Sequence, residues 1–191
     1  PSFKYPGRTV TELIMSGLPT TIELAIYSIL FAILLGVISG LVASLNPGKI
    51  LDILPMSISL LGICIPSIIL GPVLVLIFGI WYEVLPVYGW GDNPGDKILP
   101  TITLGTAYAA IFARLTRGGM LEILGQDYIR TARAKGLSEI RIVIVHALRG
   151  GILPVISFLG PAIAGLLAGS FVVETIFQIN GVGRFYVQAA F

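Results

Sequence analysis

The sequence predicts an all-α membrane protein in which several helices cross a lipid bilayer as a bundle. Its 191 residues are 55% hydrophobic and only 12% charged, whereas soluble globular chains carry about 25% charged residues. Several stretches also approach or exceed the ~20 apolar residues that a membrane-spanning helix needs. A chain this poor in charge has too little polar surface to cover a globule in water.

The first candidate span covers Thr21–Leu45, which carries one charge, Glu23, near its start. The segment before it, Pro1–Pro19, is mixed in character. Its apolar residues recur at helical spacing, which predicts a helix lying along the membrane surface; they are Val10, Leu13, Ile14 and Leu18.

Three further stretches predict spans. Ile53–Ile80 and Gly151–Val173 carry no charge. The uncharged part of the third stretch, Ile98–Ala113, is shorter and ends at Arg114, so this span continues only if the arginine side chain reaches the headgroups. We therefore expect about four spans.

Small residues and prolines within these stretches predict packed helices. The pairs Gly36/Gly40 and Gly165/Gly169 have the spacing that lets helix backbones approach closely. Prolines interrupt the second and fourth stretches and tend to bend a helix, because each lacks a backbone donor. Two interpretations stay open for these positions, simple packing and gating of a translocation pathway; the prolines are Pro66, Pro72, Pro154 and Pro161.

The basic residues predict an orientation. Four spans divide the loops into two sets, one with eight Lys and Arg residues and one with four. Because cytoplasmic loops are enriched in Lys and Arg, we expect Arg114–Gly150 to be cytoplasmic. The Trp81–Lys97 loop, rich in Trp and Tyr, would then lie on the outer side, where these aromatics suit a membrane interface.

The residue inventory argues against catalysis by this chain. One cysteine, Cys64, and one histidine, His146, make neither an internal disulfide nor a protein-only zinc site. We expect Cys64 to be a buried apolar residue. The G-x-x-x-x-G-K-[ST] phosphate loop does not occur. We therefore expect no metal and no cofactor, and any ATP hydrolysis would belong to other subunits.

The basic stretch Arg130–Gly150 is the most informative segment. Gln126–Lys135 predicts a short helix, Gly136 a left-handed residue that ends it, and Ser138 the cap of a second helix. One interpretation is a cytoplasmic docking element. The other is a helix-turn-helix, since Ala132, Gly136 and the residues after them also fit that motif. The second helix is apolar on all sides and leads into a span, so it offers few groups to base edges.

YIRTARAKGL at Tyr128–Leu137 resembles the cytoplasmic EAA loop of binding-protein-dependent ABC transporter permeases. The longer run Leu115–Ser157 and the segment VVETIFQINGVGR at Val172–Arg184 are similar to the B-type subunit of oligopeptide and dipeptide permeases. Arg130 and Thr131 depart from the general Glu-Ala-Ala pattern, as is usual in the peptide branch, and Asn180 stands where the family often has proline.

The resemblance implies a permease domain over residues 1–191, with a coupling loop at about 118–150 and further spans beyond both ends of this sequence. It implies a multi-pass subunit of the bacterial or archaeal plasma membrane that forms part of a peptide pathway. The implied partners are a second permease, two ATP-binding subunits, an extracytoplasmic binding protein and the bilayer. The resemblance implies no nucleic-acid partner. The implied docking residues are Tyr128, Ile129, Arg130, Thr131, Ala132, Arg133, Ala134, Lys135, Gly136 and Leu137.

Two alternatives to peptide import remain. Related permeases import nickel, glutathione or other small solutes with the same architecture. A membrane-tethered DNA-binding regulator is the more distant alternative, and it predicts DNA retention that falls steeply with salt.

Overall fold

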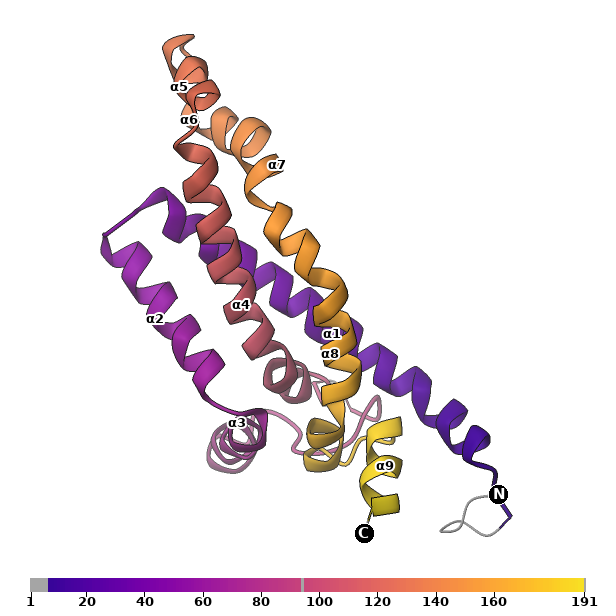
Figure 1. Cartoon of the computed structure of the whole chain (residues 1–191). Coiled ribbons are helices and arrows are strands. Elements are labelled where there is room, and N and C mark those ends of the chain that lie inside the picture. Colours follow the sequence, from indigo (N-terminus) through magenta and orange to yellow (C-terminus); the bar gives the residue numbers. More distant parts are fainter. Residues whose placement is uncertain (1–6, 94, 191) are drawn as a thin grey trace. The chain divides into compact units, whose positions relative to one another are not determined.

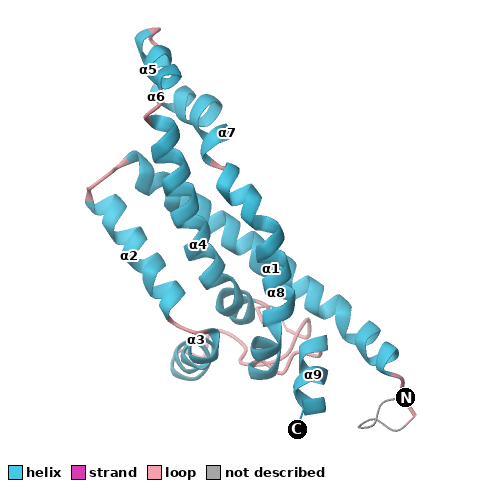
Figure 2. Ribbon diagram, in the orientation of Figure 1, coloured by secondary structure: helices cyan, strands magenta, loops and turns pink. Residues whose placement is uncertain are grey.

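The computed structural model describes residues 7–93 and 95–190, and within these ranges it contains helices and loops but no strand (Figure 1; Figure 2). The helices in chain order are α1 (Val10–Leu45), α2 (Ile50–Cys64), α3 (Ser67–Leu74), the π-helix η1 (Val75–Trp81), α4 (Ile98–Leu124), α5 (Asp127–Ala134), α6 (Glu139–Arg141), the π-helix η2 (Ile142–Ala147), α7 (Leu148–Gly151), α8 (Leu153–Ile176) and α9 (Val182–Ala190).

The chain forms two compact units. The first unit contains Pro1–Phe31, Ile65–Thr106 and Ile163–Phe191, and the second contains Ala32–Cys64 and Ala107–Ala162. Helices α1, α4 and α8 each contribute residues to both units.

Three helices, α1, α4 and α8, are long and apolar enough to cross a membrane. Helix α2 and the continuous segment α3–η1 form a bent pair, which adds a fourth span if the two parts cross the membrane together. The predicted all-α, polytopic class is confirmed. The second stretch differs from the prediction because it is broken at Ile65–Pro66. Proline lacks a backbone donor and disfavours the α conformation at the preceding residue, so Pro66 caps α3 and does not sit inside a helix.

Two other boundaries differ from the sequence-based expectation. Residues from Val10 onward belong to α1 and do not form a separate surface helix, and Pro19 lies inside α1; residues 1–6 lie outside the described part of the chain. Helix α4 continues past Arg114 as far as Leu124. The helical spacing of Val10, Leu13, Ile14 and Leu18 agrees with α1, and both α1 and α4 extend beyond the predicted spans.

Two of the predicted packing glycines, Gly36 and Gly40, lie directly against α4 in the second unit. A Cβ added to Gly36 would lie 2.6 Å from the Ala109 carbonyl oxygen, and one added to Gly40 would lie 2.6 Å from the Thr116 Cβ. The two glycines therefore let α1 and α4 pack backbone to backbone in this unit.

The glycine pair of α8, Gly165 and Gly169, has different surroundings in the first unit. No atom lies within 4 Å of a Cβ added to Gly169, and Gly165 is half-buried. Pro72 and Pro161 lie inside α3 and α8.

Apolar side chains cover much of the surface, including Leu34, Leu61 and Ile156, which are each more than half exposed. Cys64 is also exposed, so its predicted burial within the chain is wrong. In a membrane protein, lipid covers such residues, so apolar character alone does not separate core positions from lipid-facing ones.

Candidate subunit-docking site

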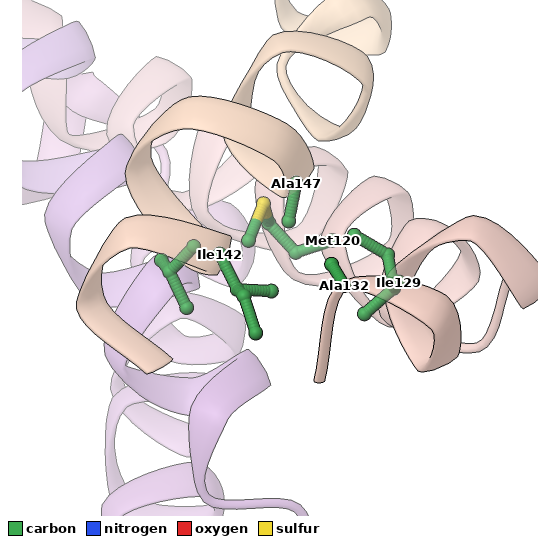
Figure 3. Close-up of a cluster of buried hydrophobic side chains, with 6 residues drawn as sticks. Met120, Ile129, Ala132, Ile142 and Ala147 are labelled. Carbon is green, nitrogen blue, oxygen red and sulfur yellow. The ribbon is translucent and has the colours of Figure 1, made fainter. Parts of the chain in front are cut away.

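Helix α5 is the centre of the candidate site, and two of its eight residues face inward. Ile129 is fully buried and Ala132 is 8% exposed. They belong to a cluster with Met120 from α4 and with residues of η2 (Figure 3). An isolated helix of this length is unstable in water, so this cluster stabilises α5 in its position.

The cluster is built from one side of each contributing element. Its buried members are Met120, Ile129, Ala132, Ile142, Val143 and Ala147, and partly buried residues from the same unit surround them, namely Leu41, Ile123, Leu124, Leu137 and Leu148. The two helices of the predicted pair therefore share one apolar core, and the buried Ile142 and Val143 side chains are withdrawn from solvent.

The turn after α5 has the geometry of a Schellman motif. Gly136 has φ of +77°, as the glycine at this position predicted. Its N–H donates to the Arg133 carbonyl at 2.9 Å, and the Leu137 N–H donates to the Ala132 carbonyl at 3.3 Å. Ser138 occupies the N-cap of α6, but its hydroxyl makes no capping hydrogen bond. The backbone, more than the serine, defines this turn.

An ion pair closes the same turn from outside. Arg133 donates from Nε to Glu139 Oε1 at 2.8 Å and from Nη2 to Oε2 at 3.1 Å. These hydrogen bonds lower the pKa of the Glu139 carboxyl and raise that of the Arg133 guanidinium. Both side chains are largely exposed, at 43% and 64% for Arg133 and Glu139, so the pair orients the turn more than it stabilises the fold.

The outward face of α5 presents most of the predicted docking residues. Tyr128 is 49% exposed, and the polar or small residues on this face are exposed as well: Arg130, Thr131, Arg133, Ala134 and Lys135. Arg130 makes one long contact with Asp127, 3.4 Å from Nη1 to Oδ1. Ile140, 73% exposed, adds an apolar side chain that the sequence reading missed.

Glycine contacts hold the segment after η2 against α4. A Cβ on Gly150 would lie 2.8 Å from Ile123 Cδ1. Gly151 abuts Met120, and Gly119 abuts the Gly151 carbonyl oxygen. Gly119, Gly150 and Gly151 were the available sequence signal for this close packing.

A partly buried ion pair joins α2 to α4 in the same unit. Asp52 is 4% exposed, and Arg117 donates to its two carboxylate oxygens, Nε to Oδ1 at 2.5 Å and Nη2 to Oδ2 at 2.7 Å. The Gly48 N–H also donates to Oδ2 at 2.9 Å. This bidentate geometry is the strong form of an arginine–carboxylate pair.

The first unit contains a second polar centre, around Glu174 of α8. The residue is fully buried. Its Oε1 accepts hydrogen bonds from the Thr21 and Ser170 hydroxyls, both at 2.8 Å, and its Oε2 accepts one from the Arg184 N–H at 3.2 Å. The Thr21 oxygen also accepts from the Val182 N–H at 3.0 Å. Glu174 thus ties α1 and the start of α9 to α8.

A third contact set holds the Trp81–Lys97 loop to α1 within the first unit. Lys97 Nζ lies 2.6 Å from Glu23 Oε1, and the Trp90 indole N–H donates to Oε2 at 2.9 Å. The ammonium also lies 5.4 Å from the Tyr27 ring centre and 5.2 Å from that of Trp90, within cation–π range.

Comparison with known families identifies the architecture. Residues 32–191 match the family described as binding-protein-dependent transport system inner membrane component. The chain belongs to this family. Its members are inner-membrane components, and together with the apolar helices this makes the chain a multi-pass membrane protein.

Individual relatives of this transport family match the whole sequence. The chain is 47% identical over 191 residues to the oligopeptide transport system permease protein OppB of Haemophilus influenzae. It is 42% identical over 189 residues to the dipeptide transport system permease protein DppB of Bacillus subtilis. All or nearly all of this chain is covered, 100% and 99%, but only 62% and 61% of the relatives' own length.

A solved structure shows the same fold. A crystal structure described as an amino acid ABC transporter with histidines aligns with a TM-score of 0.69 at 19% identity, and the alignment covers 94% of this chain and 79% of that one. At this identity the match supports the fold alone.

Proposed function

We propose that this chain is part of the membrane-spanning permease of an ATP-driven importer, and that its cargo is oligopeptides or dipeptides. The observation that carries the proposal is the identity of 42–47% along the full sequence to relatives named as oligopeptide and dipeptide permeases. The expected partners are a second permease, two separate ATP-binding subunits and an extracytoplasmic binding protein.

In this proposal the exposed face of α5 binds an ATP-binding subunit on the cytoplasmic side of the plasma membrane. The buried face, Ile129 and Ala132, packs against the chain's own core. Movement of α5 by the partner would therefore be transmitted to α4 and η2, because packed apolar interiors transmit displacement. Arg130 and Lys135 supply positive charge at the outward face.

Charge reversal tests the docking role without disturbing the core. We expect Arg130→Glu with Lys135→Glu to abolish co-purification of the ATP-binding subunit from membranes, since like-charge contacts are costly at interfaces. Arg149→Glu is the matched control, because Arg149 is also exposed in this unit but lies outside α5. Retention of the ATP-binding subunit by the double variant would contradict the docking assignment.

Uptake measurements test the cargo separately. Cells that depend on this permease should accumulate a labelled tripeptide in an ATP-dependent way, and excess unlabelled dipeptide or oligopeptide should compete. Accumulation of nickel or another small solute without peptide uptake would retain the importer architecture but refute the peptide assignment.

A further inference from the structure

A cavity of about 500 Å³ lies between α2 and α4 in the second unit. One part of its lining is apolar and the other is polar and positively charged. The apolar lining is Ile53, Met56 and Leu60, and the polar lining is Asp52, Ser57, Arg114 and Arg117, with Gly118 beside them.

The two arginines in this cavity differ in their partners. Arg117 is neutralised by Asp52, whose two oxygens it contacts. No hydrogen bond or ion pair joins the exposed Arg114 guanidinium to any residue in the described ranges 7–93 and 95–190. The cavity therefore carries one uncompensated positive charge.

That charge lies within a helix that is apolar enough to cross the membrane, Ile98–Leu124. A cation inside a span is costly unless it reaches water, a headgroup or an anion. Arg114 has an open cavity beside it in which an anion can be held. Asp52 is not a candidate partner, because Arg117 and the Gly48 N–H already occupy its oxygens.

We propose that this cavity binds the headgroup of an anionic phospholipid, with the phosphate on Arg114. A guanidinium recognises phosphate through two parallel hydrogen bonds, and the Ser57 hydroxyl in the lining is a further donor. The apolar residues Ile53, Met56 and Leu60 suit the glycerol and the first acyl carbons. Basic cavities between membrane helices are a recognised form of lipid headgroup site.

The position of the cavity along the helices favours a lipid over a soluble anion. Asp52 lies in the first turn of α2, directly after the polar turn Asn46–Lys49. Arg114 lies on the apolar helix α4, and Ile53, Met56 and Leu60 line the same cavity. A ligand that fills this cavity therefore meets both a charged and an apolar lining.

Lipid retention tests the proposal on the full chain, extracted with any subunits that accompany it and placed in nanodiscs of phosphatidylcholine with graded phosphatidylglycerol. We expect native mass spectrometry to show phosphatidylglycerol retained by the wild type. Arg114→Gln should weaken this binding roughly tenfold, as expected for a lost hydrogen bond to a charged group.

Two further variants separate charge from space. Gly118→Leu keeps Arg114 but adds bulk where no atom lies within 4 Å of a new Cβ, so it should also reduce lipid retention. Arg149→Gln removes an exposed arginine of the same unit outside the cavity and should retain the lipid. Unchanged binding in Arg114→Gln, equal loss in Arg149→Gln, or displacement of the lipid by inorganic phosphate alone would each overturn the proposal. Binding by the isolated chain but not by the assembled complex would overturn it as well.

Discussion

The two faces of α5 should respond differently to mutation, and Ile129→Ala tests this most directly. Ile129 is fully buried in the cluster shared with α4 and η2, whereas the neighbouring Tyr128 is 49% exposed. The substitution removes three carbons from the core. At about 0.8 kcal/mol for each buried CH₂, the transfer cost is about 2.4 kcal/mol, and the cavity left behind brings typical Ile→Ala losses to roughly 2–5 kcal/mol.

This loss should appear as local opening of the segment, because the cluster is what stabilises an eight-residue helix. Each 1.4 kcal/mol changes an opening equilibrium about tenfold. Amide hydrogen exchange at Arg133 and Leu137 should therefore accelerate roughly 30-fold or more in Ile129→Ala. The measurement is exchange mass spectrometry of the chain in nanodiscs.

Tyr128→Ala provides the matched comparison on the same helix. It should leave amide exchange in α5 close to wild type but weaken the binding of an ATP-binding subunit, if the outward face docks as proposed. Unchanged exchange in Ile129→Ala together with accelerated exchange in Tyr128→Ala would refute the assignment of the inward and outward faces.

Four further outcomes follow from individual contacts. Glu174→Gln should lower the free energy of unfolding by about 1–3 kcal/mol, because the new amide NH₂ group would replace a carboxylate oxygen that now accepts a hydrogen bond from the Arg184 backbone N–H. A thermal-shift series would measure this loss. Arg117→Gln should destabilise the second unit more than Asp52→Asn in the same assay, because it leaves the more deeply buried partner, the Asp52 carboxylate, without its cation. Gly40→Leu should prevent close packing in the second unit and lower the yield of folded protein after detergent extraction. The pair at Glu139 should persist above pH 4.5 and be lost as pH falls through the lowered pKa of this carboxyl, seen as faster exchange of the turn amides only in acid.

The sequence predicted the fold class because lipid imposes a simple rule, that long apolar stretches form helices whose backbone groups are satisfied internally. The same rule failed at Pro66, where hydropathy continues across a break that proline imposes locally. Hydropathy left the end of the third span open at Arg114, and α4 continues past this residue to Leu124. Hydropathy indicates whether a segment lies in lipid or in water, whereas proline and packing decide where its helices end.

The candidate site was predictable where its geometry is local. Gly136 is the best case, since a short helix followed by glycine predicts the left-handed turn that is found. The contacts of Glu174 with Thr21 were not predictable, because 153 positions separate the two residues in sequence. The pairing of Asp52 with Arg117 was equally hidden, for the same reason.

The burial of Ile129 and Ala132 changes how the docking motif should be understood. The family resemblance implied that Ala132 is a docking residue, but the structure places this side chain against the chain's own core. An aromatic substitution at Ala132 would therefore displace α5 from its position, and loss of the ATP-binding subunit in that variant would report unfolding of the site as much as lost contact. The outward residues Tyr128, Arg130 and Lys135 are the ones whose replacement separates docking from packing, since they are exposed and lie outside the buried cluster.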